Sequence, residues 1–177
     1  HHMPIQTYTL SPDAGGTFGS ATELEFNTPH TETLGLAGDL VDCYRITLTN
    51  GIFQVLGGVS GSLEAKAALY NADGKPVGSV YYRDIDNHNR SAEYGIFIGE
   101  ESARGKGLGT ETARLFTDFG FAGLHLHRIS LRVLAENTAA RRSYEKAGFV
   151  QEGVFRDMEL LDGAYRDVVF MAKLAEN

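Results

Sequence analysis

The most regular hydrophobic pattern in the sequence runs from residue 128 to residue 134. Its apolar positions are Ile129, Leu131 and Val133, and the polar residues Arg128, Ser130 and Arg132 alternate with them. Because successive side chains of a strand point to opposite faces, this period of two residues predicts a β-strand with one buried face. Residues 93–98, which are rich in aromatic and β-branched side chains, predict a second strand.

Two predicted hairpins flank this region. Short apolar runs at 66–70 and 77–82 enclose the turn residues 71–74, and predicted strands at 153–161 and 165–173 enclose Asp162-Gly163. An Asp-Gly pair between apolar runs favours a tight turn, because glycine readily adopts the positive φ that such turns need. The polar residues 84–89 predict a loop.

Two further segments have the spacing of amphipathic helices. Apolar residues and one threonine share a face between residues 108 and 119, namely Leu108, Thr112, Leu115, Phe116 and Phe119. Asn137 predicts the N-cap of a second helix that ends near Ala147, with Gly148 at the C′ position. The order after residue 64 is therefore ββ, β, α, β, α, ββ, which indicates a mixed α/β domain.

The residues before 64 give weaker signals. Residues 1–3 are interpreted as a tag remnant and start codon, and residues 4–22, rich in glycine, serine, threonine and proline, predict a flexible arm. Apolar residues between 34 and 48 could line a helix, whereas the β-branched residues from 46 to 49 favour a strand, so both types stay open. We expect one domain over residues 23–177.

Composition narrows the class of protein. The hydrophobic fraction of 42% and the charged fraction of 22% are typical of a globular chain. A formal net charge of −7 argues against nucleic-acid binding, which usually leaves a basic footprint. No apolar run approaches the ~18 residues of a membrane span, and no signal peptide is expected. The single cysteine, Cys43, lacks a catalytic motif, cannot form an intrachain disulfide and fits a cytoplasmic protein.

Candidate chemistry is concentrated in a glycine-rich stretch, residues 104–109, between the predicted strand at 93–98 and the predicted helix at 108–119. Glycines let the backbone turn tightly, and the N–H groups at the start of a helix can cradle an anion such as a pyrophosphate. Arg104 and Lys106 can add positive charge at the rim.

Two familiar phosphate-binding motifs do not match this stretch. A P-loop is excluded because Glu100 stands at the position of its first glycine and Gly107 follows the lysine. A Rossmann fingerprint is excluded by the glycine spacing and by the position in the middle of the chain. The pattern that matches is Gln/Arg-x-x-Gly-x-Gly/Ala, formed by Arg104, Gly107 and Gly109.

The region from about residue 92 to residue 174 resembles the GNAT superfamily, and within it the branch of spermidine N-acetyltransferases and ribosomal-protein N-terminal acetyltransferases. The segments that carry the resemblance are 90–98, 104–109, 136–140, 143–149 and 163–168. The resemblance implies an α/β (α+β) fold with a mixed, mostly antiparallel central sheet and helices on both faces. In this family the part before residue 64 supplies two helices that shape the acceptor site, and here that part is glycine-rich and matches poorly.

The resemblance also implies that acetyl-CoA is the co-substrate and that no metal is needed. Backbone groups of Ile96, Phe97 and Ile98 would hold the pantetheine arm, and the same residues would serve as an ordinary core strand. The pyrophosphate would lie on Arg104, Gly105, Lys106, Gly107, Leu108 and Gly109. The side-chain amide of Asn137 would contact the cofactor, or would act only as a helix cap.

Two side chains are candidates for catalysis. Tyr144 would protonate the departing thiolate, because a phenol that titrates near pH ~10 stays protonated at neutral pH and a thiol titrates near ~8.5. Without the resemblance, its spacing would favour a core tyrosine. Glu93 would be the general base for the acceptor ammonium, acting directly or through a water molecule, or would be an ordinary strand charge.

The function that follows is direct transfer of an acetyl group from acetyl-CoA to a primary amine. A polyamine, an antibiotic-like amine, an amino acid and a protein N-terminus are all open as acceptors. A polyamine site would want several acids, such as Glu23, Glu25, Glu32, Asp39, Asp42 and Glu64, although a solvated acidic surface explains these residues more simply. A homodimer is compatible with this interpretation. The alternative is a non-catalytic GNAT-fold module that binds acetyl-CoA.

Other polar residues have simpler interpretations. His125 and His127 favour a polar strand edge over a zinc site, because two histidines supply too few ligands. Tyr81 and Tyr82 could border the acceptor cleft, or could belong to the core and surface of a strand.

Overall fold

The protein is described by a computed structural model, which covers residues 22–23, 41–47, 53–59, 65–71 and 75–176. The strands of this part form one nine-stranded sheet in the order β1-β2-β3-β4-β5-β6-β7-β9-β8. Only β1 with β2 and β6 with β7 are parallel neighbours; the other pairs are antiparallel. The prediction of a mixed, mostly antiparallel sheet is confirmed.

The elements follow the predicted order after residue 64. The strands are β1 Thr22–Glu23, β2 Val41–Thr47, β3 Phe53–Val59, β4 Ala65–Tyr70, β5 Pro76–Asp86, β6 Ser91–Ile98, β7 Arg128–Leu134, β8 Val150–Leu161 and β9 Ala164–Leu174. The helices are α1 Leu108–Ala122 and α2 Thr138–Lys146, with a short 3-10 helix at Glu101–Ala103 before α1. Several bounds differ by one to four residues. The largest difference is at the end of β5, which continues through a register irregularity to Asp86 and so takes up the first residues of the loop predicted at 84–89.

The part before residue 64 contributes strands wherever the structure describes it. β2 and β3 form an antiparallel pair that continues into β4. The strand preference of Ile46 and Thr47 therefore prevails over the helical spacing at 41–47. The predicted arm at 4–22 lies outside the described residues except for Thr22, and so does any acceptor-site helix between residues 24 and 40.

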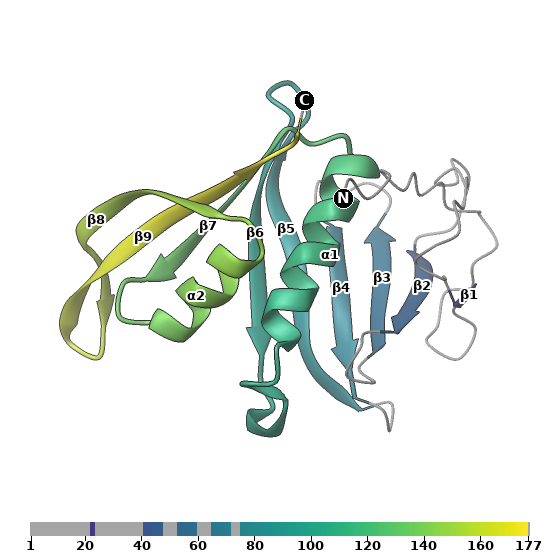
Figure 1. The fold of residues 1–177 in the computed structure, drawn as a ribbon, viewed down its shortest axis with the longest axis horizontal. Coiled ribbons are helices and arrows are strands. Elements are labelled where there is room, and N and C mark those ends of the chain that lie inside the picture. The colour runs from purple at the N-terminus through teal and green to yellow at the C-terminus, as the bar shows by residue number, and fades with distance from the viewer. Residues whose placement is uncertain (1–21, 24–40, 48–52, 60–64, 72–74, 177) are drawn as a thin grey trace.

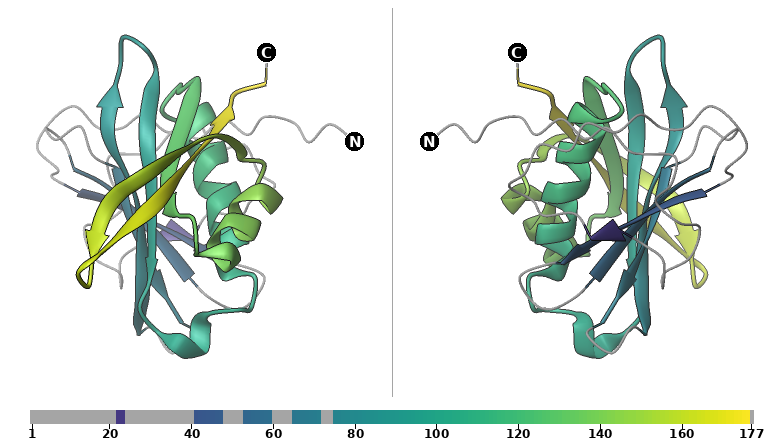
Figure 2. Two further views of the ribbon diagram at one scale, coloured as in Figure 1. Left: turned by 90° about the vertical axis from the view of Figure 1, so that its left-hand side faces the viewer. Right: turned by 90° about the vertical axis from the view of Figure 1, so that its right-hand side faces the viewer.

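Helices α1 and α2 pack against each other and lie on the same side of β5 and β6 (Figures 1 and 2). We call this side of the sheet the helix face. Helix α2 begins as predicted, because the Asn137 side chain accepts a hydrogen bond from the Ala140 N–H, and it is followed by Gly148 with φ of 96°. The helix cover expected on the opposite face is not seen among the described residues.

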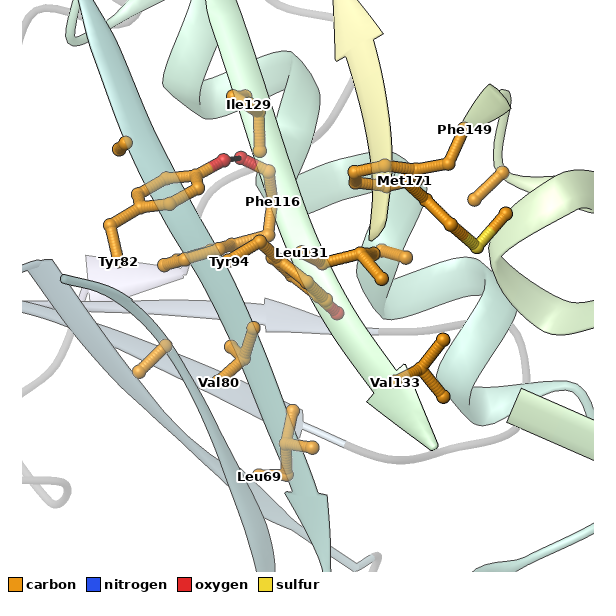
Figure 3. Close-up of a cluster of buried hydrophobic side chains, with 14 of the residues drawn as sticks. Leu69, Val80, Tyr82, Tyr94, Phe116, Ile129, Leu131, Val133, Phe149 and Met171 are labelled. Atoms are coloured by element: carbon orange, nitrogen blue, oxygen red, sulfur yellow. Dashed lines mark hydrogen bonds between the residues drawn. The ribbon is translucent and has the colours of Figure 1, made fainter. Parts of the chain in front are cut away.

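The core lies between the helix face and α1 (Figure 3). Tyr82 stacks on Phe116 of α1 with ring centroids 4.5 Å apart, and its hydroxyl donates a hydrogen bond to the Phe116 carbonyl. Gly120 makes this contact possible, since a Cβ there would lie 2.4 Å from the Tyr82 hydroxyl oxygen. Tyr82 is thus a core residue, which corrects the idea that it borders the acceptor cleft.

The hairpin of β8 and β9 forms one edge of the sheet (Figure 1). Many of its apolar side chains are exposed to solvent. The large exposed residues are Val150, Val154, Phe155, Met158, Leu160, Leu161, Tyr165 and Leu174. Such an edge usually needs a covering partner, because an exposed apolar strand promotes association. Among the described residues, neither helix is both long and apolar enough to cross a membrane.

Candidate active site at the diverging strands

Strands β6 and β7 are paired at one end and separate toward the other (Figure 1). Their parallel register covers only Ser91–Glu93 against Arg128–Ser130. Beyond Glu93, β6 remains hydrogen-bonded to β5 as far as Ile98, and β7 remains hydrogen-bonded to β9. The edge of β6 at residues 94–98 that faces β7 therefore has no strand partner among the described residues, although backbone N–H and C=O groups require one.

Ile96, Phe97 and Ile98 lie on this open edge. Ile96 and Ile98 pack against the core, whereas Phe97 is 63% exposed on the other face. Both interpretations of the segment are therefore compatible: its side chains belong to an ordinary strand, and its backbone edge has no strand partner among the described residues, although the Ile98 carbonyl accepts hydrogen bonds from Arg104.

The glycine-rich stretch connects the end of β6 to α1. Gly107 is the N-cap of α1 with φ of 84°, and Gly105 has φ of 72°. A Cβ at either position would meet no atom within 4 Å, so these glycines are required by backbone conformation and the space beside them is open. The first N–H groups of α1, from Leu108 onward, have no partner within the helix. These are the features expected of an anion cradle, and we use that name for residues 105–109.

Gly109 is required for a different reason. A Cβ there would lie 3.3 Å from the Ser143 side-chain oxygen of α2. One residue later, the hydroxyls of Thr110 and Ser143 lie 2.8 Å apart in a hydrogen bond. The close approach of the two helices keeps the start of α1 beside α2.

Arg104 adopts a position that the sequence did not predict. Its guanidinium donates hydrogen bonds to the Ile98 carbonyl at 3.0 and 2.8 Å and to the Gly99 carbonyl at 3.4 Å. The side chain therefore fastens the loop to the end of β6. The sequence had predicted instead that it would project at the rim of the phosphate site. Lys106 is exposed.

Asn137 is exposed and performs its capping role through the Oδ1 atom, which accepts from the Ala140 N–H at 3.1 Å. Its Nδ2 group has no partner among the described residues. The cap thus leaves a donor at the start of α2.

Tyr144 lies on α2 with its ring packed edge-on against two aromatic rings. The centroid of Tyr94 is 6.2 Å away and that of Phe149 is 6.0 Å away. The Tyr144 hydroxyl has no hydrogen-bond partner in the described part of the chain. Burial raises the pKa of Tyr144 above its ordinary value, and nearby Tyr81 raises it further. The phenol is therefore protonated at neutral pH.

Glu93 is the last residue of β6 that pairs with β7. Its carboxylate accepts hydrogen bonds from Arg83 of β5, with Nε at 3.1 Å and a shorter contact from the terminal nitrogen, and from Arg132 of β7 at 3.0 Å. We call these three residues the ion-pair cluster. It joins three strands where β6 and β7 begin to separate, and the Glu93 side chain is 18% exposed.

Sequence reasoning missed the two arginine partners of Glu93. Arg132 was visible on the polar face of the alternating strand, but nothing along the sequence showed which carboxylate it would meet. Only the register of Arg83 opposite Glu93 and the neighbouring position of β7 bring them together.

The described residues contain no group of three or more histidines, cysteines or acids that could hold a metal ion.

Comparison with known proteins identifies the family. Residues 54–150 match the family model described as the acetyltransferase (GNAT) domain. Spermidine N(1)-acetyltransferase of Escherichia coli strain K12 is 38% identical over 103 residues, which are 58% of this chain and 55% of that protein. The putative ribosomal N-acetyltransferase YdaF of Bacillus subtilis strain 168 is 32% identical over 133 residues, 75% of this chain and 70% of that protein.

Solved structures give the same result. A spermidine N-acetyltransferase SpeG variant from Vibrio cholerae superposes with a TM-score of 0.61 at 33% identity, covering 65% of this chain and 68% of that one. A dodecameric form of that enzyme gives the same TM-score and identity over 64% and 66% of the two chains. The chain spans just over half the length of the Escherichia coli relative. From the domain match and these similarities, the chain belongs to the GNAT acetyltransferase family.

Proposed function

We propose that this protein is an N-acetyltransferase that moves an acetyl group directly from acetyl-CoA to a primary amine. The observation that carries the proposal is the gap between β6 and β7, which has an open backbone edge on one side and the protonated Tyr144 phenol near it. The names of the relatives, which include spermidine and ribosomal-protein acetyltransferases, support the same reaction class.

The described residues fit acetyl-CoA. Residues 105–109 would hold the pyrophosphate on the first N–H groups of α1, since the space beside Gly105 and Gly107 is open. The edge of β6 at 96–98 would pair with the pantetheine amides, and the Asn137 Nδ2 group would donate to the same ligand. Bound acetyl-CoA would supply the thioester from which the acetyl group is transferred.

Tyr144 would act on the leaving group. As the amine nitrogen bonds to the acetyl carbon and the carbon–sulfur bond breaks, the Tyr144 hydroxyl would give its proton to the sulfur. The proton that the nitrogen loses on becoming an amide would then return the Tyr144 phenolate to the neutral phenol. Burial raises the pKa of Tyr144, which keeps the phenol protonated before the reaction and also makes it a weaker acid, so its proton would move only as charge develops on the sulfur. Holding both substrates in one gap would supply much of the remaining rate enhancement.

Glu93 would help to remove the proton that the acceptor ammonium loses before the attack. Its ion pairs with Arg83 and Arg132 oppose a role in which it stores that proton, because protonation would leave two guanidinium groups without their acid. We therefore propose a relay, in which Glu93 orients a water molecule that carries the proton to solvent. No covalent bond to the enzyme is formed at any step.

The acceptor is a small or peptide-borne primary amine. In the ion-pair cluster, two guanidinium groups outweigh one carboxylate, so this part of the surface does not itself attract a polycation. We propose that the residues before about 64, which include five of the six acids named above, decide which amine is accepted. This division follows from the match of the later segments to the family and the poor match of the first part.

The decisive experiment is a turnover screen with acetyl-CoA and a panel of amines, read by release of free thiol. The panel contains spermidine, an aminoglycoside, an amino acid and a short peptide with a free N-terminus. Turnover with any amine of the panel supports the proposed enzymatic activity, and the amine with the highest turnover identifies the acceptor class. Tight binding of acetyl-CoA without turnover on any amine would favour the non-catalytic module.

We further propose that the protein is cytoplasmic and assembles with copies of itself, a homodimer being the smallest such assembly. The exposed apolar residues of β8 and β9 support self-association, and the Vibrio cholerae relative is described as dodecameric. Sedimentation at several protein concentrations tests this, and a monomer at every concentration would contradict it.

A further inference from the structure

The side chain of Tyr81 crosses from β5 over β6 at a glycine. Tyr81 and Gly95 are directly paired in the antiparallel register. A Cβ on Gly95 would lie 2.3 Å from the ring carbon that carries the Tyr81 hydroxyl and 2.5 Å from the hydroxyl oxygen itself. The far end of the Tyr81 ring therefore occupies the place where any other residue at position 95 would put its side chain.

This position brings the phenol to the gap between β6 and β7. Neighbouring strands are about 4.8 Å apart, so a ring that starts on β5 and ends over β6 points its hydroxyl toward the far edge of β6. At Gly95 that far edge is already open, because pairing with β7 stops at Glu93. The Tyr81 hydroxyl has no hydrogen-bond partner in the part of the chain that the structure describes.

Tyr81 and Tyr144 approach this gap from opposite faces of the sheet. Tyr94 and Ile96 of β6 point to the helix face, where Tyr144 packs, so Gly95 and the ring above it lie on the other face. The two phenols are close enough for Tyr81 to contribute to the raised pKa of Tyr144.

We infer that Tyr81 is an acceptor-binding residue, whose hydroxyl oxygen accepts a hydrogen bond from the acceptor amine and orients it toward the gap. The inference rests on the proposed function. The anion cradle, α1 and α2 all lie on the helix face, which the core also fills. A nucleophile must therefore enter from the face that Tyr81 occupies. A phenol suits the role, because its oxygen accepts an N–H while its own proton stays available to a carbonyl.

The first test replaces Tyr81 by Phe, which keeps the ring and removes the hydroxyl. The KM for the best amine of the panel should rise about 10-fold, the effect of one hydrogen bond to a charged group. The KM for acetyl-CoA and the melting temperature should not change. Tyr165→Phe is the matched control, since Tyr165 is 64% exposed on β9 and distant in register from Gly95.

The second test replaces Gly95 by Ala, whose methyl group would displace the Tyr81 ring. The KM for the amine should rise at least as much as in the first variant. In a Tyr81→Ala background the same change at 95 should have little further effect, because the displaced ring is gone. Gly153→Ala on β8 is the control, as a Cβ there meets no atom within 4 Å.

The outcomes separate this inference from the function on which it rests. If the unaltered protein turns over an amine and Tyr81→Phe leaves the KM for that amine unchanged, the inference is wrong and the function stands. A parallel loss of acetyl-CoA affinity or of melting temperature would show a structural role and also overturn it. If the unaltered protein acetylates no amine of the panel, both proposals fall.

Discussion

The two sides of strand β6 differ in every physical respect. On the helix face, Tyr94 is almost fully buried among the rings of Tyr82, Phe116 and Phe149. On the opposite face, Glu93 joins two arginines, and Phe97 is exposed. Because side chains alternate along a strand, one short segment can support a packed core and a polar working surface at the same time. The residues predicted to do chemistry are distributed over both faces, with Tyr144 packed against Tyr94 on one face and Glu93 paired with arginines on the other.

The largest expected effect is on the helix face, at Tyr144. Tyr144→Phe should lower turnover by about 10²- to 10⁴-fold, because the thiolate loses its proton donor. The affinity for acetyl-CoA should change little, since the hydroxyl matters mainly in the transition state. Turnover, calorimetric affinity and thermal melting are measured on the same variant. Near-normal turnover would return Tyr144 to a packing role.

On the opposite face, Glu93→Gln should lower turnover by about 10²-fold if the proton relay is correct. Glutamine keeps an oxygen for one guanidinium, so the free energy of unfolding should fall by less than about 1 kcal/mol. Glu152→Gln is the matched control, since Glu152 also pairs with an arginine, Arg128, away from the gap. Equal turnover in the Glu93→Gln and Glu152→Gln variants would show that Glu93 takes no part in proton transfer and only links the strands.

At the anion cradle, Gly107→Val should weaken acetyl-CoA binding by about 10- to 100-fold. A β-branched residue at φ of 84° is strained by about 1–3 kcal/mol, so the loop should leave the conformation that aims its N–H groups. Gly153→Val serves as the control, because position 153 lies in a strand with open space around it. An unchanged dissociation constant in a folded variant would show that the pyrophosphate lies elsewhere.

The smallest effect is expected from Tyr94→Phe. The Tyr94 hydroxyl is buried without a hydrogen-bond partner among the described residues, so its removal should leave stability unchanged or raise it by up to about 1 kcal/mol.

The same variant should flatten the alkaline limb of the stability curve. Burial raises the pKa of Tyr94, so the unfolded chain ionises first, and stability is lost as pH rises above the ordinary tyrosine value of about 10. Urea unfolding at pH values below and above that point measures both effects. A large loss of stability at neutral pH would reveal a partner for the hydroxyl.

Local patterns predicted the elements well, and tertiary contacts account for what they missed. The alternation at 128–134 and the cap at Asn137 gave β7 and α2 with nearly their observed bounds, because both depend on neighbouring residues alone. The glycine loop was predicted for the same reason. The inward turn of Arg104 depends on how the loop folds back on the end of β6, and the partners of Glu93 depend on strand register. The pairing of Tyr81 with Gly95 belongs to the same class.

Arg104 has one more consequence. By binding the Ile98 and Gly99 carbonyls, it makes the loop and the strand end a single unit. The surfaces proposed for the pantetheine arm and for the pyrophosphate of acetyl-CoA are then held at a constant separation before the ligand arrives. A long, flexible molecule that binds to such a preorganised surface loses only its own conformational freedom, and the protein adds little entropic cost. Loosening Arg104 would therefore weaken affinity without removing any contact to the ligand.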